Sequence, residues 1–205
     1  MKKKQGLARE VMIIGSTGYH SFVEQEGDLH GAVQNCREAK IMLLDPLKHG
    51  ALDRARSIPA PGITVEAIRE QIIKSVDFLK SLKAAGKNVR LKLCPDMPLL
   101  KMAILGEYAF IRHYNTGRNP RALPEFTFKN ERNRENLYLP VYRYFCARWQ
   151  EPGIPEYDLD NDELVYRDQA GSELLRAAFN ETPMTCYGHA VHVKYGEMAM
   201  QYALR

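Results

Sequence analysis

Cationic side chains gather around an apolar segment, PLLKMAILGEYAFIRHYNTGRN, at residues 98–119. Lys101 lies in its first apolar run, and Arg112, His113 and Arg118 end or follow the second. A lysine can neutralise a phosphate or carboxylate, and an arginine can hold such a group through two parallel hydrogen bonds. The segment therefore predicts a β-hairpin that carries an anion-binding site. Surface arginines, a core histidine and a lysine that extends along a strand edge are the alternative interpretation.

Two further polar residues follow apolar runs earlier in the chain. His20 ends the turn GSTGYH, and Asp45 closes the run KIMLLDP. Ligands of open α/β sheets bind just beyond the carboxyl ends of the strands, so we predict that His20 and Asp45 line the cleft. The turn lacks both the Gly-Lys-Ser/Thr ending of a phosphate-binding P-loop and the spacing of a dinucleotide fingerprint. A loop histidine and an Asp-Pro turn are the simpler interpretations.

The tail GHAVHVKYGEMAM repeats a His-x-Lys spacing at His192 and Lys194. If a histidine nucleophile exists, His192 is the first to test, with His113 as a second candidate. His189 and His192 are three residues apart and could share a helix face as metal ligands, but no third ligand is evident nearby. The sequence therefore predicts neither a metal nor a cofactor.

Composition limits the class of protein. The apolar fraction is 45% and the charged fraction 26%, as in globular proteins, and the four cysteines form no CxxC pair. The net charge of +4 favours anionic partners but falls short of a dedicated nucleic-acid binder, so nucleic acid is only a weak expectation. No stretch approaches the ~20 apolar residues of a membrane span, and no signal-peptide core follows the basic start. We expect a cytoplasmic protein with reduced thiols.

Hydrophobic periodicity predicts an α/β fold. Apolar runs at 11–15 and 40–46 flank a helix that Asp28 would cap, which indicates a βαβ unit with parallel strands. A long amphipathic helix over 64–85 begins at a capping threonine and ends before a glycine. A strand at 88–94 alternates, with its polar residues Arg90 and Lys92 expected to face outward.

The second half of the chain is less regular. Residues 115–136 are expected to form a loop, and 138–150 a helix that packs back onto the sheet. The acidic, turn-rich segment 151–163 marks a boundary, after which AGSELLRAAFN predicts a helix. The prediction is a main α/β domain at 1–150 and a small C-terminal α+β extension at 151–205, which could also pack on the main domain.

The order of elements and the hairpin together resemble one half of the phospholipase D superfamily. Two consecutive strands in that family carry the motif His-x-Lys-x4-Asp, in which the histidine is the nucleophile and the lysine binds phosphate. The segment LLKMAILGEYAFI lies on this pattern, with Leu99 at the histidine position, Lys101 at the lysine position and Gly106 at the aspartate position. The resemblance covers roughly residues 10–150 and implies a phospholipase D-like half, a mixed β-sheet flanked by helices.

The departure from the motif bears on function. Leucine cannot act as a nucleophile, so only the phosphate-binding lysine of the motif remains. The resemblance therefore implies binding rather than the family's catalysis. It also implies a homodimer, because single-half members of the family usually pair.

Three functions follow from the sequence. The leading hypothesis is a cytoplasmic regulatory domain that binds a phosphorylated small molecule or nucleotide through the hairpin cations, with His20 and Asp45 beside them. A phosphodiesterase or nuclease that uses a non-standard histidine, at position 20, 113 or 192, is the alternative. The third is an interaction protein that acts through residues 151–205.

Overall fold

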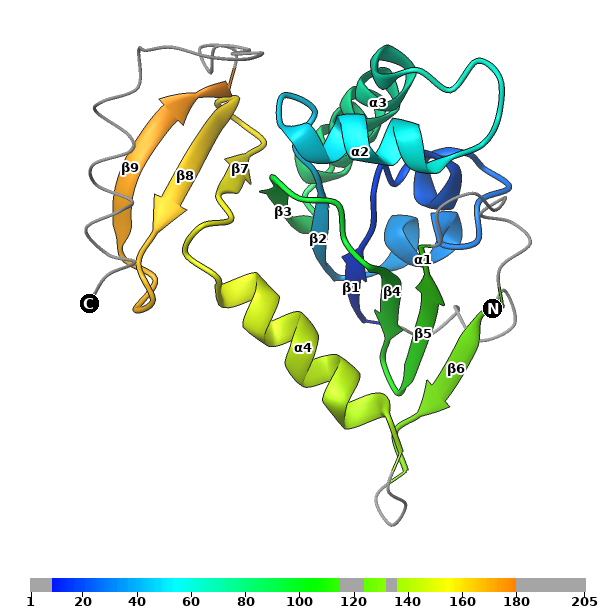
Figure 1. Cartoon of the computed structure of the whole chain (residues 1–205). Helices are drawn as coiled ribbons and strands as arrows, with labels where there is room; N and C mark the ends of the chain where they lie inside the picture. The colour runs from blue at the N-terminus through cyan, green and yellow to red at the C-terminus, as the bar shows by residue number, and fades with distance from the viewer. Residues whose placement is uncertain (1–8, 115–123, 132–135, 180–205) are drawn as a thin grey trace, which may run out of the picture.

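Nine strands form one mixed β-sheet within residues 9–114, 124–131 and 136–179, the parts of the chain that the computed structural model describes (Figure 1). The strand order is β6-β5-β4-β1-β2-β3-β7-β8-β9, and helices cover both faces. The α/β class with a mixed sheet flanked by helices is therefore confirmed. The strands are β1 (Glu10–Ile14), β2 (Glu38–Leu44), β3 (Asn88–Cys94), β4 (Leu100–Leu105), β5 (Tyr108–His113), β6 (Phe126–Lys129), β7 (Glu156–Asp158), β8 (Glu163–Arg167) and β9 (Glu173–Ala178).

The centre of the sheet is parallel. β1 pairs with β2, and β2 with β3, all in the same direction, as the predicted βαβ unit requires. A short π-helix (Tyr19–Val23) and α1 (His30–Asn35) connect the first pair, while α2 (His49–Ser57) and α3 (Val65–Ala84) connect the second. Leu29, rather than the expected Asp28, precedes the first turn of α1 and provides no side-chain cap.

The long helix α3 begins and ends where the sequence indicates. The Thr64 hydroxyl accepts a hydrogen bond from the Ala67 N–H at 3.2 Å, and Gly86 adopts a left-handed conformation just after the last turn. Its apolar stripe is buried against the sheet and includes Ile68, Ile72, Val76 and Leu79.

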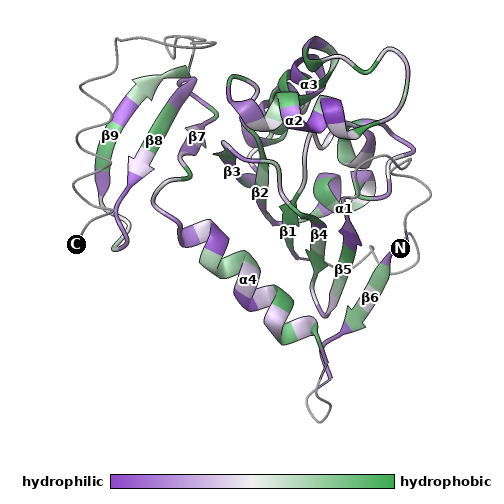
Figure 2. Ribbon diagram, viewed as in Figure 1, coloured by the Kyte–Doolittle hydropathy of each residue, from purple (hydrophilic) through white to green (hydrophobic). Residues whose placement is uncertain are grey.

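Both faces of the central strands are buried. The residues of α1, α2 and α3 form one core with Val11, Ile41 and Leu91, while α4 (Tyr138–Gln150) forms a second core on the opposite face with Met42 and Met102. Strands covered on both faces read as continuous apolar runs, which is visible in the apolar colouring of β1 and β2 (Figure 2).

Burial of the α4 face corrects the expectation for Lys92, which was predicted to face outward. Its side chain is only 7% exposed, and its ammonium donates a hydrogen bond to the Ile154 carbonyl at 2.8 Å. Helix α4 and the chain that follows it cover this face. The alternation at 88–94 therefore separates two packed faces rather than a core from solvent.

Two other expectations are corrected. Part of the predicted loop at 115–136 is strand β6, which extends the hairpin by pairing with β5. The predicted helix at AGSELLRAAFN is strand β9, which pairs with β8. Leu, Arg and Ala are among the best helix formers, but intrinsic preferences are small in energy and tertiary pairing overrides them here.

The described part of the C-terminal extension joins the main sheet. β7 pairs with β3, and Tyr157, Leu164 and Phe179 are buried in the same core as α3. No helix among the described residues combines the length and apolarity that crossing a membrane requires.

Candidate functional site

A cavity of about 550 Å³ opens at the carboxyl end of β1. Residues of three segments that are far apart in the sequence line it, within 13–28, 54–71 and 101–114. β4 runs antiparallel to β1, so the first residues of β4 lie beside the last residues of β1. The site thus lies where the parallel centre of the sheet meets its antiparallel side.

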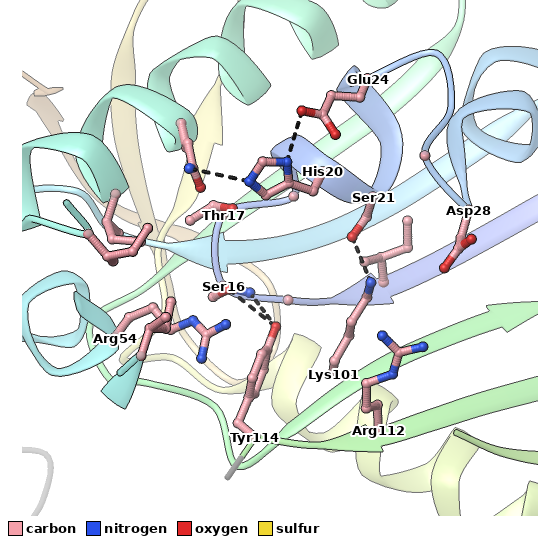
Figure 3. A pocket seen from close by; sticks show the side chains of 18 of the residues that line it. Ser16, Thr17, His20, Ser21, Glu24, Asp28, Arg54, Lys101, Arg112 and Tyr114 are labelled. Carbon is pink, nitrogen blue, oxygen red and sulfur yellow. Dashed lines mark hydrogen bonds and ion pairs between the residues drawn. The ribbon is translucent and has the colours of Figure 1, made fainter. Parts of the chain in front are cut away.

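Two of the predicted cations are cross-strand neighbours at this cavity. Lys101 of β4 lies opposite Arg112 of β5, and both line the cavity (Figure 3). The Lys101 ammonium donates to the Ser21 hydroxyl at 2.7 Å, and the Arg112 guanidinium donates to the Glu125 carboxylate at 3.2 Å. A lysine in an apolar strand is thus explained, because its ammonium reaches a polar cavity.

A third cation, Arg54 of α2, was not predicted. It is 6% exposed, and its guanidinium lies 4.5 Å from the centre of the Tyr114 ring. One terminal nitrogen donates to the Ser57 hydroxyl at 3.2 Å, while the buried Nε has no hydrogen-bond partner in the part of the chain that the structure describes. Arg54 forms no ion pair with any residue that the structure describes.

The cavity destabilises the charged forms of its cationic side chains. Burial lowers the pKa of Lys101, the neighbouring Arg112 lowers this pKa further, and Asp28 and Glu125 oppose the shift. Burial also lowers the pKa of Arg54. Desolvation and like charge destabilise cationic groups, and a bound anion would compensate for both.

The turn at the end of β1 is shaped by glycine and anchored by tyrosine. Gly18 has φ of 77°, and a Cβ atom there would lie 2.5 Å from the ring of buried Phe22. The Ser16 N–H donates to the Tyr114 hydroxyl at 2.9 Å, and that hydroxyl lies 3.3 Å from Ser16 Oγ. These contacts hold the turn against the end of the hairpin and fix one wall of the cavity.

Two histidines also line the cavity. His20 Nδ1 lies 2.9 Å from a Glu24 carboxylate oxygen, and His20 Nε2 lies 3.4 Å from the Gln71 side-chain nitrogen. His113 follows Arg112 on β5 and is exposed at the cavity.

The structure therefore brings together His20, Lys101, Arg112 and His113 of the predicted site. Asp45 is buried and does not line the cavity; its carboxylate accepts a hydrogen bond from the Leu47 N–H at 2.8 Å, as in an Asp-Pro turn. Burial raises the pKa of this carboxyl group.

The remaining candidates, Arg118, His189, His192 and Lys194, lie outside the described residues. Leu99, at the position of the family nucleophile, is 71% exposed. Among residues 9–114, 124–131 and 136–179, no three histidine, cysteine or acidic side chains are arranged to hold a metal ion.

One signal for Arg54 was present in the sequence. The small residues Gly50, Ala51, Ala55 and Ser57 share the buried side of α2 with it. An arginine among small residues on a helix face is either covered by a neighbour or directed into a cavity, but the sequence does not show which.

Comparison with known proteins leaves the family open. No protein-family model matches the sequence, and no curated protein matches it. Among solved structures, the chain is similar to TrmBL2, which is described as an archaeal chromatin protein with a novel mode of DNA binding. The identity is 14% and the TM-score 0.40, over 73% of this chain and 46% of that protein, so the chain spans about half its length. Similarity at this level assigns neither fold nor function.

Proposed function

We propose that the chain is a regulatory module that binds a phosphorylated small molecule, nucleotides included, in the cavity at the end of β1. The observation that carries this proposal is the pair of cations Arg54 and Lys101, which both line the cavity and form no ion pair with a described residue. A cation that is taken out of water without a counter-ion is destabilising, and a bound anion removes that penalty.

The other groups at the cavity suit phosphate in particular. Ser21, Thr17 and Ser16 line it with hydroxyl groups, next to the cationic side chains. Phosphate oxygens accept several hydrogen bonds at once, and bonds between charged partners are shorter and stronger than neutral ones. The coincidence of cations and hydroxyl donors therefore favours a phosphorylated ligand.

The resemblance to the phospholipase D superfamily remains part of this proposal. Lys101 would keep the phosphate-binding role of the motif lysine, while Leu99 and Gly106 provide neither nucleophile nor carboxylate. Such a site suits a module that binds its ligand without reacting with it. The resemblance also favours a homodimer.

Substitution of Lys101 tests the proposal. Thermal shift with a panel of nucleotides and sugar phosphates identifies a ligand, because a ligand at about 100 times its Kd stabilises the folded state by about 2.7 kcal/mol. We expect Lys101→Met to weaken binding of that ligand about tenfold or more. Lys129→Met, at an exposed lysine on β6, is the matched control. If no phosphorylated compound stabilises the protein, or if Lys101→Met binds as the unchanged protein does, the proposal is wrong.

A second candidate function rests on the contact between His20 and Glu24. A carboxylate beside an imidazole orients the ring, as is common for a histidine that attacks phosphorus or transfers a proton. Hydrolysis of bis(p-nitrophenyl) phosphate that is abolished by His20→Ala and retained in His30→Ala would establish it. His30 bonds to the Phe22 carbonyl at 2.8 Å and does not line the cavity.

A further inference from the structure

The cations of the cavity form two groups with different neighbours. Lys101 and Arg112 lie opposite each other on β4 and β5, and Lys101 bonds to Ser21. Arg54 comes from α2 and stacks on Tyr114. Figure 3 shows Arg54 on one side of Tyr114, and Lys101 with Arg112 on the other.

Arg54 is a buried cation with a hydrogen-bond donor that the described residues leave unused. Its side chain is more than nine-tenths buried, it lines the cavity, and its Nε has no hydrogen-bond partner among the described residues. A buried donor that stays unsatisfied is destabilising, so an acceptor atom from a ligand would stabilise Arg54. Lys101 donates to the neutral Ser21, and the nearby carboxylates of Asp28 and Glu125 offset the burial of its charge only in part, so Lys101 favours an anion on its own side of the cavity.

We infer that the ligand carries two phosphate groups, one bound by Arg54 and the other by Lys101 and Arg112. This inference rests on the proposed function and deepens it. The cavity of about 550 Å³ is of the size that small organic ligands occupy, which is more than a single phosphate fills. Ile58, Ile63 and Ile68 also line it and provide an apolar surface for the organic part of the ligand.

Matched pairs of compounds test the inference by isothermal titration calorimetry at constant ionic strength, because salt screens these charges. The probes are phosphate against pyrophosphate, AMP against ADP, and fructose 6-phosphate against fructose 1,6-bisphosphate. We expect at least one compound with two phosphates to bind about tenfold or more tightly than its partner with one.

Arg54→Met then assigns the second phosphate. This variant keeps an unbranched apolar stem but removes the guanidinium group, and we expect it to reduce the preference for two phosphates to within about twofold. Arg56→Met, at an exposed arginine of the same helix, should keep the full preference. If Arg54→Met fails to fold, Arg54→Lys replaces it and should still lower the preference, because lysine lacks the two-pronged donor geometry.

The outcomes separate the two proposals. Equal affinity within every pair, or a preference that survives substitution of Arg54, overturns the inference and leaves the proposed function intact. Failure of all six compounds and of the wider panel to bind overturns both.

Discussion

Gly27 shows how closely the turn beside the cavity is packed. A Cβ atom there would lie 2.5 Å from the Ser21 carbonyl oxygen and 2.8 Å from that of Glu24. Its N–H also donates to the Glu24 carbonyl at 2.9 Å. Backbone atoms cannot rotate away as a side-chain end can, so a larger residue at this position would force the backbone of the turn to shift.

We expect Gly27→Ala to lower the free energy of unfolding by about 1–3 kcal/mol, the usual cost of overpacking. It should also weaken ligand binding, because relief of the clash displaces the segment that carries Ser21. Gly153→Ala is the control, since a Cβ atom at Gly153 would meet no described atom within 4 Å. Urea unfolding of the two variants measures the difference. Equal stabilities would contradict the prediction, because they would show that the backbone of the turn shifts at no cost in free energy.

Arg54 should lower stability in the absence of ligand. Its charge is buried without an ion pair among the described residues, so Arg54→Met should raise the free energy of unfolding by about 1 kcal/mol even though it impairs binding. Thermal unfolding without ligand checks this. A variant less stable than the unchanged protein would mean that stacking on Tyr114 and the bond to Ser57 outweigh the buried charge.

At this scale the sequence predicted part of the site. Lys101 and Arg112 were recognisable because a hairpin places such residues on known faces. Arg54 and Ser21 were not assigned, because their place depends on how α2 and the π-helix pack on the sheet. Asp45 was expected at the cleft from its position after a strand, but a local hydrogen bond to Leu47 already satisfies its carboxylate.

At the scale of elements, Arg176 joins the three strands β7, β8 and β9. Its guanidinium contacts the carboxylates of Asp158 and Glu163, each at 3.0 Å, and that of Glu173 at 2.7 Å. The hydrogen bond from the Asn161 side chain, with those from the Asp160 N–H and Arg176, lowers the pKa of Asp158 to about 2.

This lowered pKa predicts an acid dependence of stability. A carboxyl group whose pKa is lower in the folded state contributes stability that is complete above the unfolded pKa, about 4, and is lost as pH falls to about 2. We therefore expect the stability difference between the unchanged protein and Asp158→Asn to narrow between pH 4 and pH 2. Urea unfolding at several pH values measures it. A stability difference for Asp158→Asn that stays constant from pH 4 to pH 2 would contradict the prediction.

The sequence was informative about elements with a strong local signal and misleading about those without one. The period of α3, its threonine cap and the alternation of β3 were all recognisable. β9 was mistaken for a helix because ELLRAA lacks β-branched residues, and its strand form depends on pairing with β8. The burial of Lys92 depends on α4, which lies about fifty residues further along the chain.

At the scale of the whole molecule, the sheet is continuous from β6 to β9. The acidic segment after Gln150 was expected to mark a boundary, and the described residues beyond it complete the edge of β3. Composition identified a turn-rich connection correctly, but strand partners are not encoded locally. The predicted homodimer remains a prediction, which sedimentation equilibrium can test.

We expect truncation after Gln150 to lower the melting temperature by about 10 °C or more. Removal of Tyr157, Leu164 and Phe179 takes three buried side chains from the main core, each contributing about 1.5–3 kcal/mol, and uncovers β3. Circular dichroism follows the transition. A truncated chain that melts like the full chain, yet loses dimerisation or a partner, would instead support an interaction role for residues 151–205.

The hydrogen bond between Lys101 and Ser21 joins groups that are 80 positions apart in the chain. Contacts of such long sequence separation form late, since closing the intervening loop is entropically unfavourable. A partly folded intermediate that already contains native helices would therefore lack the recognition pocket. The protein would then gain affinity for its ligand only when the hairpin docks, at the end of refolding. Ligand present from the start of refolding should leave the rate of helix formation unchanged, whereas ligand bound to the folded protein should slow unfolding.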